Sequence, residues 1–292
     1  MEMTISVFFD HVLQAVDETK RPLQEILQEI KNGGVQCVDV CFDHVLQDPQ
    51  LPRTIAQAGL CINNVYGFYD WGAEEADDLT RFEKHLLCAQ QCQAASMLVV
   101  PGLVDGLETF TKDQWLDEVA VERLFSTHPQ IGAMTRTLQQ AAKRTSKACK
   151  IPLCIEDFDQ LQAPYAHMYG MLWFFRHVPQ LQCLFDTGNF YHSDESSVEA
   201  LTLLESYVIG LHCKDRGTEN GYETNRHCRG LRAVAVGDGY VPIAPMLHRL
   251  MDHGFAGSLS IEHYGLPGAL PAILSSAAFL RDAIASYGTR KK

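Results

Sequence analysis

Short apolar runs alternate with amphipathic stretches along the whole of this 292-residue chain. Runs rich in β-branched and aromatic residues predict strands, and apolar residues at helical spacing predict helices. The predicted strands are Ile5–Asp10, Cys37–Phe42, Leu60–Tyr66, Ser96–Pro101, Ile151–Glu156, Gln182–Asp186, Val208–Cys213 and Ser258–Glu262. The predicted helices cover residues 20–32, 50–58, 76–93, 129–149, 167–177, 196–206, 242–253 and 268–286.

This regular alternation of strands and helices predicts an α/β fold with a parallel sheet covered by helices. Eight strand–helix pairs fit a closed (β/α)8 barrel, or TIM barrel. A doubly wound open sheet is the alternative, but eight even repeats fit it less well. Because barrels of this length are usually single domains, we expect one domain over residues 1–292.

Two connections are longer than a barrel requires, residues 102–128 after the fourth strand and 215–241 after the seventh. The first contains Thr111-Lys-Asp-Gln114, a capping box that predicts a short helix. Long loops at the carboxyl face of a barrel commonly enclose substrates. For each loop, a disordered or oligomer-contacting insertion is the alternative.

Composition narrows the class of protein. Hydrophobic residues make up 46% and charged residues 21% of the chain, as in globular proteins. The net charge of −12 argues against a nucleic-acid partner, because phosphate binding needs clustered Lys and Arg.

The first residues lack a basic segment and no apolar run approaches the roughly 20 residues of a membrane span, so we expect neither signal peptide nor membrane anchor. None of the ten cysteines forms a C-x-x-C pair, which favours reduced core thiols and a cytoplasmic location.

Four consecutive apolar runs in the second half of the chain each end with one residue that can bind a metal. These residues are Glu156, Asp186, His212 and Glu262. The carboxyl ends of parallel strands meet at one face of a barrel, so the four side chains are expected to form one divalent-cation site. A salt-bridged strand end is the alternative for any one of them taken alone.

The alternation of side chains along each strand supports this site. The faces that carry Glu156, His212 and Glu262 hold mainly small or polar residues, whereas Leu184 on the face of Asp186 leaves the sixth strand ambiguous. Converging buried carboxylates repel one another unless a cation lies between them. Oxygen-rich ligation with one imidazole suits Mn²⁺, Mg²⁺ or Co²⁺ better than structural zinc, although Zn²⁺ is possible.

Over essentially its whole length the chain resembles the xylose-isomerase-like barrels, a superfamily of sugar and sugar-phosphate isomerases and epimerases. The resemblance rests on the four ligand positions in their local motifs and on the Gly237-Asp-Gly-Tyr240 segment. The motifs are Ile155-Glu156-Asp157, Phe185-Asp-Thr-Gly-Asn189, Leu211-His-Cys-Lys-Asp215 and Ile261-Glu-His263.

Within the superfamily, the resemblance to ketose 3-epimerases implies a metal-dependent isomerase or epimerase. It implies that Glu156, Asp186, His212 and Glu262 hold the metal. Glu156 and Glu262 would be the catalytic acid/base pair, one removing a proton from carbon and the other returning it. The metal would bind two adjacent substrate oxygens and stabilise an enediolate. The implied partner is a small sugar or sugar derivative, and relatives form dimers or tetramers.

The same resemblance suggests substrate-binding residues and one departure. Asn189 stands where the ketose 3-epimerases carry a substrate-binding His, so ketohexose specificity is not implied. Arg216 is the nearest candidate for a substrate-binding Arg after the seventh strand. Lys214 is similar to a position of the inosose-dehydratase-like branch, where it could bind or protonate a leaving oxygen; a surface lysine is the alternative. Tyr66 could wall the site.

Three other functions remain to be weighed. An inosose-dehydratase-like lyase would use the same ligands. A non-catalytic sugar-binding barrel is a second alternative, against which the intact ligand set argues. Hydrolysis of damaged DNA on this barrel needs a multi-zinc cluster with histidines on the third and fourth strands, and the predicted third and fourth strands carry none.

Overall fold

The computed structural model describes residues 3–72, 78–148, 150–218 and 225–290. The chain has two compact units, in which residues contact one another densely. Unit 1 is Met1–Asn63, Asp186–Gly188 and Ile209–Lys292, and unit 2 is Asn64–Phe185 and Asn189–Val208. A single domain over 1–292 stays a prediction.

The strands of unit 1 run in the order β2-β1-β9-β7-β8. The first four are parallel to their neighbours, with Ser6 of β1 beside Ser260 of β9 and His212 of β7 beside the same Ser260. The last strand is antiparallel and forms a hairpin with the end of β7. The bounds are β1 (Thr4–Phe8), β2 (Cys37–Cys41), β7 (Val208–Gly217), β8 (Arg232–Val234) and β9 (Ser258–Glu262).

The strands of unit 2 are parallel and follow the order of the sequence. They are β3 (Cys61–Phe68), β4 (Ser96–Val100), β5 (Leu153–Ile155) and β6 (Gln182–Asp186). The order for the whole chain is β6-β5-β4-β3-β2-β1-β9-β7-β8, with an additional pairing of β6 and β7. Eight parallel strands thus form a closed barrel flanked by helices, which confirms the predicted (β/α)8 fold and excludes the open sheet.

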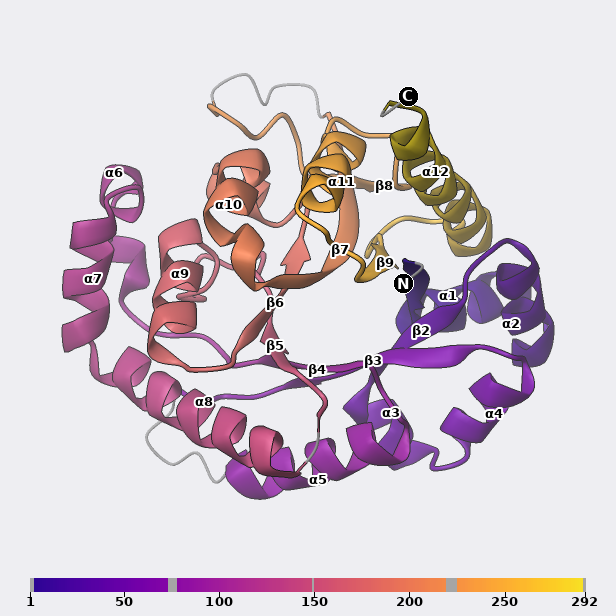
Figure 1. Cartoon of the computed structure of the whole chain (residues 1–292), viewed down its shortest axis with the longest axis horizontal. Coiled ribbons are helices and arrows are strands. Elements are labelled where there is room, and N and C mark those ends of the chain that lie inside the picture. The colour runs from indigo at the N-terminus through magenta and orange to yellow at the C-terminus, as the bar shows by residue number, and fades with distance from the viewer. Residues whose placement is uncertain (1–2, 73–77, 149, 219–224, 291–292) are drawn as a thin grey trace. The chain divides into compact units, whose positions relative to one another are not determined.

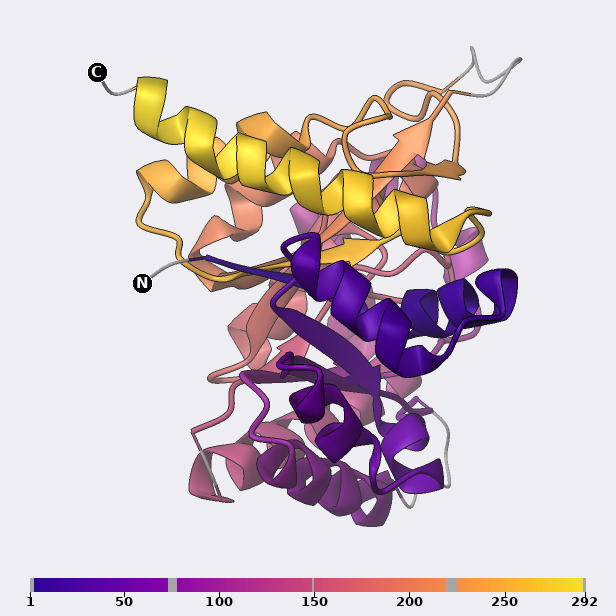
Figure 2. The ribbon, with the colours of Figure 1, turned by 90° about the vertical axis from the view of Figure 1, so that its right-hand side faces the viewer.

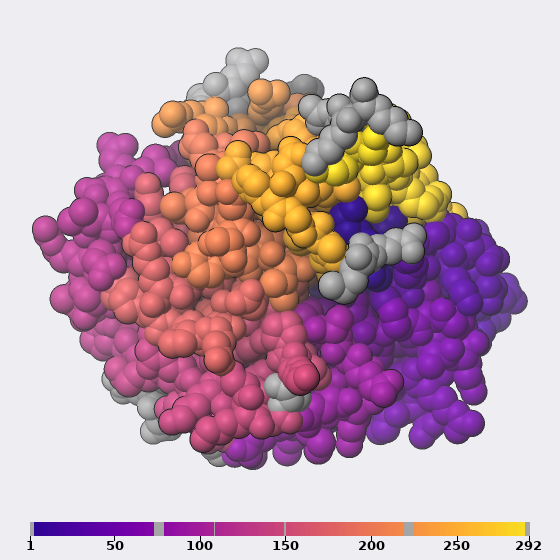
Figure 3. Space-filling view, in the orientation of Figure 1, coloured from indigo at the N-terminus to yellow at the C-terminus, as the bar shows by residue number. Residues whose placement is uncertain are grey.

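Unit 1 carries six α-helices among its described residues. In it α12 contacts α1, α2 and α11. Figure 2 shows α12 (yellow) running beside α1 (indigo), and α11 and α12 are neighbours on the surface in Figure 3. The helices are α1 (Phe9–Thr19), α2 (Leu23–Asn32), α3 (Phe42–Gln47), α4 (Leu51–Gln57), α11 (Ile243–Asp252) and α12 (Ala269–Arg290) (Figure 1).

The described part of unit 2 also has six α-helices and three short 3-10 helices. In α6 the Thr111 side chain accepts from the Gln114 N–H and the Gln114 side chain accepts from the Thr111 N–H, so the predicted capping box is present. The helices are α5 (Asp78–Gln91), α6 (Lys112–Trp115), α7 (Glu118–Thr127), α8 (Pro129–Ala148), α9 (Met168–His177), α10 (Ser197–Leu204), η1 (Leu107–Thr109), η2 (Phe190–Ser193) and η3 (Glu205–Tyr207).

The sequence pattern does not predict the helices α1, α3 and α7, the strand β8 or the short 3-10 helices η1 and η2. Both α1 and α3 begin directly where a strand ends, at Phe9 and Phe42, and no side chain caps either start. The pattern therefore extends the strands to Asp10 and Phe42 and offers no signal for a new element. Within the predicted loop 215–241, β7 continues to Gly217 and pairs with β8, and residues 219–224 of that loop lie outside the described part.

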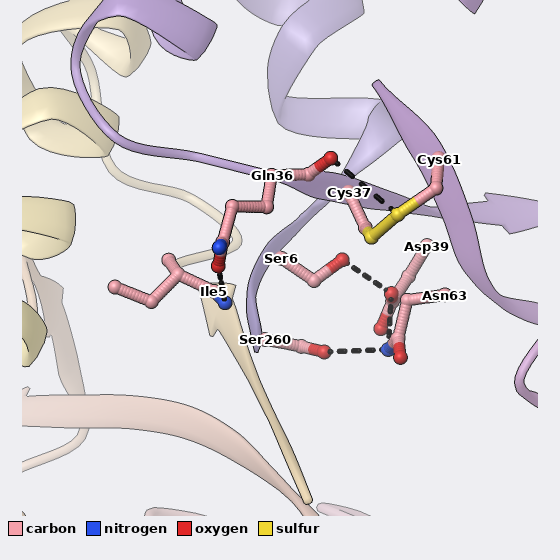
Figure 4. Close-up of a disulfide and its surroundings, with 8 residues drawn as sticks. All are labelled: Ile5, Ser6, Gln36, Cys37, Asp39, Cys61, Asn63 and Ser260. Atoms are coloured by element: carbon pink, nitrogen blue, oxygen red, sulfur yellow. Dashed lines mark hydrogen bonds between the residues drawn. A yellow bond between two sulfur atoms is a disulfide. The ribbon is translucent and has the colours of Figure 1, made fainter. Parts of the chain in front are cut away.

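One pair of cysteines departs from the expectation that the cysteines are reduced thiols. Cys37 and Cys61, on β2 and at the start of β3, form a disulfide, so these two are not the reduced thiols expected (Figure 4). Cys149 lies outside the described residues. The other cysteines are free thiols, as expected: Cys41, Cys88, Cys92, Cys154, Cys183, Cys213 and Cys228.

One described helix, α12, is long and apolar enough over residues 269–289 to cross a membrane. Core helices of globular proteins meet the same criterion. Here α12 contacts β1 and β9 as well as its neighbouring helices, and Ile273, Ala277 and Leu280 are fully buried. The apolar residues of α12 are therefore explained by the packing of its inner face against the barrel strands.

Candidate metal centre

Three of the predicted ligands are strand residues that belong to unit 1. Asp186 is the last residue of β6, His212 lies within β7, and Glu262 is the last residue of β9. All three side chains are buried. The strand register places Lys214 of β7 directly beside Glu262. The register of the parallel strands thus brings acidic and basic groups to one place.

The ammonium group of Lys214 joins two of these ligands. Its Nζ lies 2.6 Å from Glu262 Oε1 and 3.2 Å from Asp186 Oδ2. Lys214 is itself buried, which excludes the surface lysine considered as an alternative. A buried ammonium between two carboxylates shows that this position favours positive charge.

His212 lies between two acidic side chains of unit 1. Its Nδ1 is 3.6 Å from Glu262 Oε2, and its Nε2 is 3.9 Å from Asp39 Oδ2. The ring of Phe8 meets the imidazole edge to face, with 4.9 Å between ring centroids. The imidazole therefore has one nitrogen toward the proposed ligand Glu262 and the other toward Asp39.

Burial controls the protonation of Asp186. The loss of water around this fully buried side chain raises the pKa of Asp186 to about 7, although the neighbouring Lys214 ammonium lowers it. A carboxyl group with a raised pKa gains most from a bound cation, because the cation replaces the lost solvation of the charged form. The charge pattern of unit 1 thus suits a divalent metal ion.

Asp39 is a buried acid of this site that the sequence pattern did not indicate. It lies in the middle of β2 and is fully buried. Its Oδ1 accepts hydrogen bonds from Ser6 Oγ at 2.6 Å and from Asn63 Nδ2 at 2.8 Å, and Asn63 also contacts Ser260 (Figure 4). Burial raises the pKa of the Asp39 carboxyl, and His212 opposes the rise. The available signal was one acid inside an otherwise apolar strand.

Asp215 organises the segment that contains Gly237-Asp-Gly-Tyr240. Its Oδ2 accepts from the backbone N–H groups of Gly237 and Gly239 at 2.9 Å each, and its Oδ1 accepts from those of Arg216 and Val241. A Cβ at Gly239 would collide with this carboxylate, so the close approach requires glycine. The two sequence motifs are therefore one structural unit.

The Arg216 side chain, which is predicted to bind substrate, donates hydrogen bonds to two backbone carbonyl groups of unit 1. Its Nε donates to the Gly188 carbonyl at 3.2 Å and its guanidinium also donates to the Leu231 carbonyl at 3.1 Å. These contacts fix the loop that follows β6 against the β7–β8 hairpin. A role in substrate binding stays a prediction.

Unit 2 holds three more of the predicted site residues. Glu156 follows β5 and is buried. The Asn189 side-chain amide donates to the Asp157 carbonyl at 2.8 Å, which ties the end of β6 to the end of β5. Tyr66 is buried within β3 and packs edge to face against Phe68. Tyr66 thus packs inside unit 2, and contact with a substrate stays a prediction.

The long connection 102–128 is anchored within unit 2 by an aromatic contact. The indole of Trp115 stacks on the imidazole of His167, with centroids 3.9 Å apart and planes 7° apart. His167 Nδ1 lies 2.6 Å from Glu195 Oε1, and all three side chains are buried. The connection is thus packed against the rest of unit 2 through Trp115. This contact argues against the disordered insertion that was considered as an alternative.

Two histidines near the ends of β1 and β9 have a packing role. His11 and His263 are stacked with centroids 4.1 Å apart, and both are buried. The backbone N–H of His263 donates to His11 Nε2 at 3.0 Å. Desolvation lowers the pKa of His263 to about 4, so the ring is neutral at physiological pH.

The donor types across the chain fit a divalent cation. Glu156 of unit 2 and Asp186, His212 and Glu262 of unit 1 are all buried, and each can offer a ligand atom to a metal ion. Three carboxylates and one imidazole are hard and borderline donors, which divalent ions such as Mg²⁺ and Mn²⁺ accept.

Solved structures share the fold of this chain at low sequence identity. A probable 3-DHS dehydratase involved in petrobactin synthesis from Bacillus anthracis is 12% identical over 96% of this chain and 99% of its own, with a TM-score of 0.69. D-psicose 3-epimerase with D-tagatose from Clostridium cellulolyticum H10 is 13% identical over 96% and 99%, with a TM-score of 0.68. A xylose isomerase-like TIM barrel protein from Mycobacterium smegmatis in complex with magnesium is 13% identical over 98% and 97%, also with 0.68.

No curated protein is similar enough to count as a relative. The sequence profile of the xylose isomerase-like TIM barrel family, in contrast, matches residues 4–283. That match covers nearly all of the chain and agrees with the closed parallel barrel. This chain therefore belongs to the xylose isomerase-like TIM barrel family.

Proposed function

We propose that this protein is a divalent-metal-dependent isomerase or epimerase that acts on a small sugar or sugar derivative. The observation that carries the proposal is that Glu262 lies close to His212 Nδ1 and that the Lys214 ammonium joins Glu262 to Asp186. Family membership supports it, because the solved structures of this fold include sugar isomerases and epimerases.

Glu156 would complete the ligand set with Asp186, His212 and Glu262. Mn²⁺, Mg²⁺ or Co²⁺ is the expected ion, and Zn²⁺ would also fit the donors. The magnesium complex of the mycobacterial barrel supports a hard divalent ion. When bound, the cation would act as a Lewis acid toward two adjacent substrate oxygens.

Glu156 and Glu262 would move the proton. A carbon acid next to a carbonyl is deprotonated by a carboxylate on one side, and a second carboxylic acid on the other side returns a proton to the neighbouring position or to the opposite face. Both glutamates are buried, which would limit the access of water to the reacting carbon. Asn189, Lys214, Arg216 and Tyr66 are proposed to contact the substrate hydroxyl groups.

Hydrogen exchange tests the proposal. The Mn²⁺-loaded protein is incubated in deuterated buffer with a panel of ketoses, ketose phosphates and inososes, and deuterium in the recovered sugar is measured by mass spectrometry. Wild type should introduce deuterium into at least one substrate. Glu156→Gln and Glu262→Gln should each slow exchange by at least a hundredfold.

Glu195→Gln is the matched control, because it alters a buried carboxylate that pairs with a histidine elsewhere. It should exchange like wild type. Full exchange in either glutamate variant of the site would exclude the acid/base pair. Sugar binding with no exchange for any substrate would instead support a non-catalytic sugar-binding barrel.

An inosose-dehydratase-like lyase is the second candidate, and the buried position of Lys214 favours it. An ammonium group beside the proposed base could protonate a leaving hydroxyl. A lyase would release water and form an unsaturated or deoxy product, which mass spectrometry distinguishes from an isomer. Loss of product formation with retention of deuterium exchange in Lys214→Met would identify this reaction.

We also propose a cytoplasmic location and a homo-oligomer, a dimer or tetramer. The seven free thiols among the described residues support the location, whereas the Cys37–Cys61 disulfide is atypical of a cytoplasmic protein. Light scattering and cell fractionation test these two points.

A further inference from the structure

One oxygen of the Asp39 carboxylate accepts hydrogen bonds, and the other oxygen points toward His212. Oδ1 accepts from Ser6 Oγ and Asn63 Nδ2, and these two bonds fix the orientation of the group. Oδ2 accepts no hydrogen bond from the described residues and lies 3.9 Å from His212 Nε2. A buried carboxylate oxygen without a donor is costly, so the position calls for a partner.

The two nitrogens of His212 face different partners. Nδ1 faces Glu262, one of the proposed ligands, and Nε2 faces Asp39. An imidazole that binds a metal through one nitrogen carries its proton on the other. Nδ1 is on the side of the proposed metal, so the proton belongs on Nε2, where Asp39 can accept it.

We propose that Asp39 is a positioning residue, which holds His212 in the Nε2–H tautomer and directs its Nδ1 to the metal. This inference rests on the proposed metal site. Asp39 accepts the Nε2–H and strengthens Nδ1 as a donor, as carboxylates do for metal-binding histidines. Phe8 limits rotation of the ring from its edge. The network of Ser6, Asn63 and Ser260 in turn keeps Asp39 in place (Figure 4).

The first test measures metal affinity and not turnover. Mn²⁺ binding is titrated by calorimetry on metal-free wild type, Asp39→Asn and Glu195→Gln, with folding checked by circular dichroism. Asp39→Asn should weaken Mn²⁺ binding by about 10- to 100-fold, the usual effect of losing such a partner. Glu195→Gln removes a buried carboxylate beside a different histidine, His167, and should bind Mn²⁺ like wild type. Equal affinity in wild type and Asp39→Asn would overturn the inference.

A second measurement requires no change at Asp39, because the buried variant could fail to fold. In Mg²⁺-loaded wild type labelled with ¹⁵N-histidine, NMR correlations between ring nitrogens and carbons report the tautomer. His212, assigned by comparison with His212→Gln, should be protonated at Nε2. Protonation of His212 at Nδ1 alone would overturn the inference.

The outcomes separate this inference from the proposed function. If Asp39→Asn weakens Mn²⁺ binding but wild type exchanges no substrate hydrogen, the positioning role stands and the isomerase proposal fails. If wild type binds Mn²⁺ and exchanges hydrogen while Asp39→Asn binds equally well, only the positioning role fails. A wild type that binds no divalent ion would overturn both.

Discussion

The Nζ of Lys214 lies 2.6 Å from Oε1 of Glu262, so an ammonium group already balances a carboxylate that we assign to a divalent metal. The same ammonium contacts Asp186. Lysine and metal thus compete for the same negative charge, and binding of a cation should release Lys214 toward a substrate. This relationship makes the stability of the metal-free protein depend on Lys214.

Lys214→Met should therefore destabilise the protein more in EDTA than in Mn²⁺. Removing one partner of a buried ion pair costs about 3–5 kcal/mol, because the carboxylates remain buried without compensation. Urea unfolding with and without Mn²⁺ measures the effect. Lys112→Met is the control, because Lys112 pairs with Asp194 while largely exposed, and its loss should cost under about 1 kcal/mol in either condition. Equal stability of wild type and Lys214→Met in EDTA would contradict this competition.

Metal binding should strengthen as pH rises toward neutrality. With the pKa of Asp186 raised to about 7, a proton must leave this carboxyl group when a cation binds. Below pH 7 the Mn²⁺ affinity should increase about tenfold per pH unit and then level off. Calorimetry between pH 5.5 and 8, in buffers of different ionisation enthalpy, counts the released proton. An affinity that is constant over this range would disprove the assignment of Asp186 as a ligand.

The same raised pKa sets the stability of the metal-free protein. The folded state retains a proton that the unfolded chain releases above about pH 4. Stability without metal should therefore fall as pH rises from about 4 to about 7, with the full cost present above pH 7. Saturating Mn²⁺ should remove this decline, which thermal unfolding in EDTA and in Mn²⁺ can compare.

The sequence predicts the barrel because each strand contributes its own local signal. The predicted bounds of β6 and β9 agree with the structure, and the other strands differ at their ends. By contrast, α1 is missed because Phe9 continues an apolar run without a cap or turn residue. Asp39 is missed for another reason. One acid inside an apolar strand is only a weak local signal, and the role of Asp39 depends on His212, which is distant in the sequence.

His263 should make the protein sensitive to acid. Its pKa is lowered to about 4 mainly by burial, so the folded state keeps the ring neutral while the unfolded chain is protonated below about pH 6.5. There is no effect above pH 6.5, and stability is lost as pH falls from 6.5 to 4, by about 3 kcal/mol. His263→Phe keeps an aromatic ring beside His11 and removes this titration.

Urea unfolding at pH 7 and pH 4.5 compares the variants. The loss of stability between the two pH values should be smaller in His263→Phe than in wild type by about 2–3 kcal/mol. His253→Gln changes an exposed histidine and should leave the difference as in wild type. If His263→Phe loses as much stability at pH 4.5 as wild type, the ring is not the source of the acid sensitivity.

Asp215 should hold the Gly237–Tyr240 segment in place. Its two carboxylate oxygens accept hydrogen bonds from four backbone N–H groups. Replacing one oxygen by an amide NH2 would place a donor opposite these N–H donors. Asp215→Asn should cost about 3 kcal/mol or more in unfolding free energy, since hydrogen bonds to a charged group contribute about 1.5–3 kcal/mol each. Limited proteolysis should then cut near residues 237–241 faster than in wild type, at unchanged global circular dichroism. Asp238→Asn alters an exposed acid of the same segment and should be cut at the wild-type rate. Equal cleavage rates for Asp215→Asn and Asp238→Asn would show that the segment is held by other contacts.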